Sequence, residues 1–176
     1  MMKKVLAVMM MAMVMLCVAG CSEKNTDNTT ENAQNTNQTV SQTKTADLKT
    51  VLSDINTKYA DVTGNLRELT DTTELEKYYS VPAGAVKSFA AEIGSDTNAP
   101  VEIILIEAND SDSVTQIKQK LDMRYNSVYS IYASYSAEQL DTVKACKVEV
   151  NGNYVTLVIA PDYDGIMEIV NKAIAG

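Results

Sequence analysis

The sequence contains no histidine in its 176 residues. Histidine is the commonest general base near neutral pH and the commonest metal ligand, so its absence removes the simplest routes to acid–base catalysis and zinc binding. A glycine-rich phosphate loop, a nucleophile-elbow motif and a Cys/His set with metal-ligand spacing are missing as well. The sequence therefore predicts no catalytic residue, no metal site and no cofactor, and it favours a protein that is not an enzyme.

A long transmembrane run is also missing, but the N-terminus carries a shorter apolar run. Lys3 and Lys4 precede an uncharged apolar segment over residues 5–18, which the small residues Ala19 and Gly20 close. This segment is shorter than the roughly 20 residues that a helix needs to cross a bilayer. The layout predicts a secretory signal peptide over residues 1–20.

The motif Val18-Ala19-Gly20-Cys21 resembles the lipobox of bacterial lipoproteins. The resemblance implies cleavage before Cys21 and a diacylglyceryl thioether on its sulfur. Acyl chains such as palmitate would then anchor the mature protein to the cell membrane, on its extracellular face. Cysteine suits this role because its thiolate is a good nucleophile. The alternative is an ordinary signal peptide followed by an incidental cysteine.

Charge and cysteine content narrow the predicted partners. The chain has 15 basic and 23 acidic residues, and loss of Lys3 and Lys4 with the leader takes its net charge from −8 to about −10. Such a domain repels phosphate backbones, so nucleic acid is not a predicted partner. Cys17 leaves with the leader and Cys21 carries the lipid, which leaves Cys146 without a disulfide partner. Cys146 is predicted to be a small buried apolar residue.

Composition and apolar periodicity predict a tether followed by one α+β domain. Residues 21–45 are rich in Asn and Thr and predict a disordered tether, whereas residues 46–176 hold enough apolar residues for a core. Helical spacing predicts helices over residues 47–62 and 113–134, a short helix opened by a capping box at Thr73, and a last helix after Pro161. Strands are predicted over residues 86–93, 101–108, 146–150 and 154–160, the last two joined by a type I′ turn at Asn151-Gly152. The predicted architecture is a four-stranded antiparallel sheet of two hairpins, with helices packed mainly on one face.

Two residues of the long predicted helix are candidate binding residues. Arg124 is one of only two arginines, and its planar guanidinium suits a carboxylate ligand. A structural salt bridge is the alternative for Arg124. Tyr129 lies about 80° from the centre of the helix's apolar stripe, where its ring and hydroxyl suit stacking on sugars or peptides of the wall. Core or rim packing is the alternative for this tyrosine.

Several acidic motifs suggest chemistry that their context does not support. Asp110-Ser111-Asp112 and Asp162-Tyr163-Asp164-Gly165 supply oxygen ligands but lack the remaining ligands of a calcium loop. Both motifs stand at predicted helix starts, so helix capping is the preferred interpretation. Glu102 and Glu107 are predicted to face opposite sides of one strand, so they cannot flank one glycosidic bond.

Three further segments resemble the sequence pattern of a known protein family. They are Leu75-Glu76-Lys77-Tyr78-Tyr79, Val101-Glu102-Ile103-Ile104-Leu105-Ile106, and the stretch from Lys120-Leu121-Asp122-Met123-Arg124 to Tyr135-Ser136-Ala137-Glu138-Gln139. With these, the mature chain is similar to a family of uncharacterised lipoproteins of Gram-positive, Clostridia-type bacteria, defined by a domain of unknown function. The resemblance implies a Gram-positive membrane surface and a compact α+β domain. It brings no activity and no catalytic residues.

These features favour a lipid-anchored extracytoplasmic protein with a domain that does not catalyse a reaction. Its predicted partners are the lipid bilayer, through acylated Cys21, and an envelope protein or a wall glycan or peptide. The domain either binds such a partner or supports an envelope assembly. The alternative function is a cell-surface hydrolase that uses carboxylates on wall or peptide substrates.

Overall fold

The computed structural model of the chain describes residues 45–94 and 100–176. The predicted leader, Cys21 and almost all of the predicted tether lie outside these residues. Within the described ranges, no helix combines the length and the apolar character that crossing a membrane requires.

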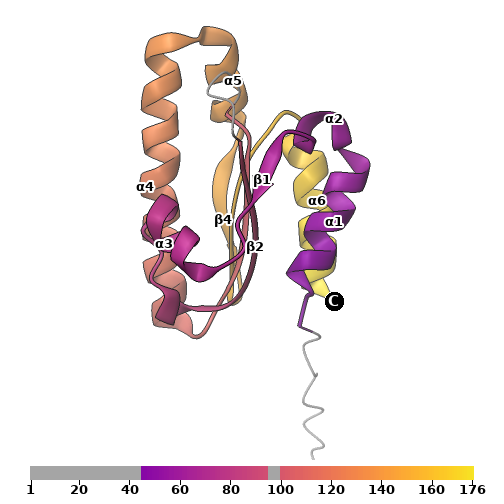
Figure 1. Ribbon diagram of the computed structural model, residues 1–176, viewed down its shortest axis with the longest axis vertical. Helices are drawn as coiled ribbons and strands as arrows, with labels where there is room; N and C mark the ends of the chain where they lie inside the picture. Colours follow the sequence, from indigo (N-terminus) through magenta and orange to yellow (C-terminus); the bar gives the residue numbers. More distant parts are fainter. Residues whose placement is uncertain (1–44, 95–99) are drawn as a thin grey trace, which may run out of the picture. The chain divides into compact units, whose positions relative to one another are not determined.

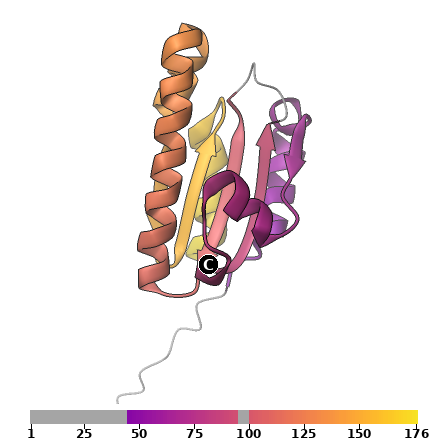
Figure 2. The ribbon, with the colours of Figure 1, turned by 60° about the vertical axis from the view of Figure 1, so that its left-hand side comes forward.

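A five-stranded antiparallel sheet forms the centre of the domain, in the order β1-β2-β3-β5-β4 (Figure 2). The strands are β1 (Leu66–Glu68), β2 (Val86–Gly94), β3 (Glu102–Ala108), β4 (Lys147–Asn151) and β5 (Tyr154–Ile159). The predicted α+β class and both predicted hairpins are confirmed, but the prediction of four strands is wrong. The missing strand was β1, whose three residues include the exposed Arg67 and Glu68 and give no apolar alternation. It exists because its backbone pairs with the edge of β2.

The central strand β3 is buried along all seven of its residues. Its core residues Ile103, Ile104, Leu105 and Ile106 alternate between the two faces of the sheet, and each has a relative exposure of 0%. A strand of this kind needs a covering layer on both sides, because apolar side chains point to both.

Helices accordingly pack on both faces of the sheet, so the prediction of one mainly covered face is wrong (Figure 1). One face carries α1 (Leu48–Lys58) and α6 (Tyr163–Ala175), with the short α2 (Ala60–Thr63) after α1. The other face carries α3 (Thr72–Tyr79) and the long α4 (Ser111–Tyr135). The remaining helices are η1 (Ala83–Ala85), which leads into β2, and α5 (Ala137–Ala145), which leads back from α4 to β4.

The long helix α4 presents the predicted apolar stripe to the sheet. Ile117, Leu121 and Val128 are buried, and Val114, Tyr125 and Tyr132 pack against the core. The stripe ends before Tyr135, which is 84% exposed at the last turn. The Ser136 hydroxyl caps the next helix by accepting from the Gln139 amide at 3.4 Å.

Local details differ from the predictions in three places. The predicted helix over residues 47–62 is interrupted at Tyr59, which has φ −120°. The cap of α3 is Asp71 and not Thr73, and Glu74 accepts a hydrogen bond from the Thr70 amide. In the β4–β5 turn, only Gly152 has positive φ, so the turn is of the II′ kind and not type I′.

The start of the described chain is fastened to the sheet. The amide of Ala46 donates to the Tyr154 hydroxyl of β5 at 3.0 Å. Asp47 then caps α1 by accepting from the amides of Lys49 and Thr50. The first helix therefore begins close to the start of β5.

Candidate functional site

A buried carboxylate on the α4 side of the sheet is the starting point of the site. Glu102 begins β3 and is only 5% exposed. The Nε of Arg124 donates to its two carboxylate oxygens at 3.1 and 3.0 Å, and Nη2 donates to Oε1. A charge in such a place needs a paired and hydrogen-bonded counterion. Arg124 therefore forms a structural salt bridge, which was the alternative interpretation of this residue.

Tyr79 completes the cluster from the end of α3. Its hydroxyl donates to Glu102 Oε2 at 3.1 Å, and the guanidinium carbon of Arg124 lies 5.6 Å from its ring centroid. Burial raises the pKa of the Tyr79 hydroxyl, and the charge of Glu102 raises it further. The hydrogen bond to Glu102 raises the pKa of Arg124. The cluster therefore joins α3, β3 and α4 through hydrogen bonds to one buried carboxylate.

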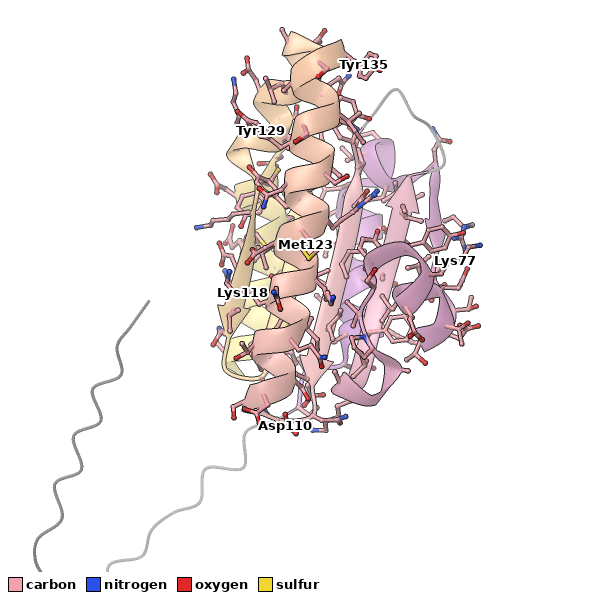
Figure 3. The ribbon with its side chains drawn as sticks, turned by 90° about the vertical axis from the view of Figure 1, so that its left-hand side faces the viewer. Lys77, Asp110, Lys118, Met123, Tyr129 and Tyr135 are labelled. Carbon is pink, nitrogen blue, oxygen red and sulfur yellow. The ribbon has the colours of Figure 1, made fainter. Side chains whose placement is uncertain are left out.

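A hollow of about 180 Å³ opens beside this cluster. We call it the α3–α4 hollow, and it is lined by Tyr78, Tyr79, Ser80, Lys120, Met123, Arg124 and Ser127. Ser80 ends α3 with φ 56°, a left-handed conformation that is uncommon outside glycine and asparagine. Met123 is 60% exposed at the rim (Figure 3). The hollow thus combines a buried ionic floor with an open apolar rim.

Cations gather around this hollow although the domain as a whole is acidic. Both arginines of the chain lie against α3 tyrosines, Arg124 at Tyr79 and Arg67 at 5.3 Å from the ring centroid of Tyr78. Lys77 lies 4.9 Å from the same Tyr78 ring. Arg67 is paired with Glu74, whereas Lys77 and Lys120 form no ion pair within the described ranges.

Tyr129, the second predicted binding residue, is not part of this hollow. Five positions separate it from Arg124, which places the two side chains about 140° apart around α4. Tyr129 is 38% exposed, and its ring centroid lies 6.5 Å from that of Tyr125 in a tilted arrangement. Met123 and Tyr129 can both be located on α4 in Figure 3. The structure therefore does not bring the two predicted residues together.

The other acidic residues take mainly structural positions. Glu107 faces the side of the sheet away from Glu102 and accepts from Lys87 Nζ at 2.7 Å and Ser88 Oγ at 3.0 Å, as the predicted opposite orientation requires. Asp110 caps α4 by accepting from the Ser113 amide at 2.8 Å, which confirms its predicted role. Asp162 stands at the N-cap of α6, as predicted, with φ 58°, but its side chain makes no capping hydrogen bond. No group of three or more Cys, Asp or Glu is arranged to hold a metal within the described residues.

Cys146 is 3% exposed between α5 and β4. Its thiol donates to the carbonyl of Thr142 at 3.1 Å, and burial raises its pKa. The residue is therefore a buried, protonated thiol, as its place in the apolar pattern predicts.

The fold and the site define a small α+β domain with a three-layer helix–sheet–helix arrangement and a cation-lined hollow over one face. Residues 58–160 match the family model described as "Domain of unknown function (DUF4358)". The chain belongs to this family, and the match covers the whole sheet and every residue of the α3–α4 hollow. No curated protein and no solved structure matches the chain.

Proposed function

We propose that this chain is a lipoprotein of the extracytoplasmic membrane surface whose domain binds another component of the cell envelope at the α3–α4 hollow. The anchor is supported by the leader and by Val18-Ala19-Gly20-Cys21. A Gram-positive source is favoured by the sequence resemblance. In this proposal the domain recognises its partner without catalysing a reaction.

The observation that carries the binding role is the cationic character of the hollow. The chain has a net charge of −8, yet Lys120 lines this hollow beside Arg124 and forms no ion pair among the described residues, and Lys77 lies against the ring of the lining residue Tyr78. An unpaired cation beside an aromatic ring and an exposed methionine suits an acidic group flanked by apolar surface. The partner of this chemistry is an envelope protein or a wall peptide that presents a carboxylate.

The hydrogen bonds of the cluster favour binding over carboxylate-based hydrolysis. Glu102 already accepts from both Arg124 and Tyr79, so it does not project toward a substrate. Glu107 lies on the other face of the sheet, where its carboxylate accepts hydrogen bonds from Lys87 and Ser88. A pair of carboxylates that acts on one bond must flank that bond from the same cleft.

Photocrosslinking in intact cells tests where the partner binds. A photoreactive amino acid is placed at Met123 on the hollow, at Tyr129 on α4, or at the exposed Asp54 on α1 as a control on the other face of the sheet. We expect a discrete crosslinked species from position 123 and none from position 54. Equal labelling at positions 123 and 54 would contradict the proposed site. Labelling confined to position 129 would show that the partner binds the other side of α4 and not the α3–α4 hollow.

Reversal of one charge gives a quantitative prediction. Lys120→Glu is expected to weaken capture at position 123 roughly tenfold, because it sets a negative charge against an acidic partner. Lys118→Glu is the matched control on the same helix, since Lys118 pairs with Asp122 and does not line the hollow. The yield of crosslinked product at increasing partner expression measures the change. Equal effects of the two substitutions would show that the hollow is not involved.

The hydrolase alternative predicts turnover. The purified chain is assayed on wall fragments and peptides, together with Glu102→Gln and Glu107→Gln. A product that disappears on one of these substitutions, while the variant keeps its fold, would favour the enzyme over the binding domain.

A further inference from the structure

A second buried carboxylate, outside the α3–α4 hollow, lies between the sheet and α1. Glu92 of β2 is 8% exposed, on the opposite face of the sheet from Glu102. The side-chain amide of Asn56 in α1 donates to its Oε1 at 2.7 Å. Both residues line a surface hollow of about 310 Å³ with Lys49, Leu52, Ser53, Thr57 and Glu68.

Among the residues that the structure describes, no hydrogen-bond donor reaches the other two oxygens of this pair. Glu92 Oε2 and Asn56 Oδ1 are both buried, and both are acceptors when the carboxyl is ionised. Leaving buried acceptors unmatched is costly, and a buried carboxylate without a counterion is more costly still. If the Glu92 carboxyl is ionised, the pair therefore lacks one hydrogen-bond donor.

The charged neighbours do not supply what is missing. Glu68 of β1 stands directly opposite Glu92 in the strand register, so it adds a like charge. Lys49 of α1 lines the same hollow, but it forms no ion pair within the described ranges. The strand on the other side of β2 places the apolar Ile103 beside Glu92.

We propose that Glu92 is held as a carboxylic acid, whose Oε2–H donates to Asn56 Oδ1 and closes a two-hydrogen-bond ring with the bond already present. One proton, bound to Glu92 Oε2 and donated to Asn56 Oδ1, satisfies both unpaired acceptors and neutralises the buried charge. The ring fastens α1, the first helix of the described chain, to β2. Raising the pH removes this proton and leaves two unpaired acceptors and a buried negative charge. The link between α1 and β2 is therefore sensitive to pH.

The electrostatics of the site agree with this arrangement. Burial raises the pKa of the Glu92 carboxyl above its ordinary value, the Asn56 hydrogen bond offsets part of this shift, and the charge of Glu68 adds to it. The folded state therefore binds the proton more tightly than the unfolded chain. Its stabilising effect is complete below the ordinary glutamate pKa and is lost as the pH rises through the higher pKa of the folded state.

Glu92→Gln tests the proposal, because its Nε2–H stands where the acid carries its proton. At pH 7, the full chain purified in detergent is expected to unfold at a temperature roughly 3 °C or more above that of the unmodified chain. The difference should shrink as the pH is lowered toward 4. Glu138→Gln, at an exposed position of α5, is the matched control and should leave the profile unchanged.

Two further measurements decide between the proton and other occupants of the site. In a carbon-13 titration of the glutamate side chains, one carboxyl should titrate above the others, and Glu92→Gln should remove that signal. A lower unfolding temperature for Glu92→Gln at pH 7, with no carboxyl titrating late, would overturn the proposal. So would a rise in the unfolding temperature on adding calcium that the unmodified chain shows and Glu92→Gln lacks, because the acceptors would then hold a cation.

Discussion

Replacing Cys21 with alanine is expected to abolish the incorporation of labelled palmitate into the protein. In the proposed lipoprotein the thioether forms on the cysteine sulfur, and alanine offers no nucleophile. Two or three acyl chains bind a membrane stably, at about 0.8 kcal/mol for each buried CH₂ group, so loss of the lipid also removes the anchor of the mature chain. The measurement is metabolic labelling of growing cells followed by gel analysis of the membrane fraction.

The chain supplies its own controls for this experiment. Cys17→Ala changes a cysteine within the leader, and Cys146→Ala changes the buried thiol of the domain. Both variants should keep the palmitate label. A Cys21→Ala protein that still carries label, or that is released from its leader with unchanged kinetics, would contradict the lipoprotein assignment and support an ordinary signal peptide.

Replacing Arg124 with methionine is expected to lower the free energy of unfolding by about 3–5 kcal/mol, because it leaves a buried carboxylate without its counterion. Glu102 is 5% exposed and accepts a bifurcated hydrogen bond from the arginine Nε and a second hydrogen bond from Nη2. The measurement is denaturant-induced unfolding of the full chain. Lys118→Met on the same helix is the matched control, since its partner Asp122 is exposed and such surface pairs contribute about 0.3–0.5 kcal/mol.

The double variant separates the cost of an unpaired charge from the loss of packing. Glu102→Leu combined with Arg124→Met removes both charges and should recover most of the stability lost in Arg124→Met alone. Tyr79 then loses its acceptor, so recovery should be incomplete. If Arg124→Met costs no more than Lys118→Met, the pair contributes no more than a surface contact and does not hold α3, β3 and α4 together.

The sequence predicted the main elements of the fold because their apolar patterns are strong. The run Ile103-Ile104-Leu105-Ile106 specified a central strand, and the spacing of Ile117, Leu121 and Val128 specified the buried side of α4. The same run contained the evidence against a one-sided sheet, since a strand that is apolar on both faces needs helices on both. β1 left no such pattern, because backbone pairing with β2 holds it and not burial of its side chains.

The site was predicted in part. The sequence indicates Arg124 as a binding residue or a salt-bridge partner, but the pattern around it does not specify which carboxylate it pairs with. Glu102 could have been found, because a charge within a central apolar strand requires a counterion and the chain has only two arginines. The contribution of Tyr79 depends on how α3 packs against the sheet, which no local pattern specifies. The same holds for Asn56 and Glu92, which lie 36 residues apart.

The two edge strands of the sheet affect whether crowded copies of this chain can aggregate through their sheets. β1 is only three residues long and exposes Arg67 and Glu68, and β4 carries Lys147 and Glu149 as a pair 3.1 Å apart. Short edges that carry charges resist pairing with the edge of another sheet. If copies of the chain are held at a membrane surface as proposed, crowding them would therefore not drive their sheets to join into a continuous aggregate.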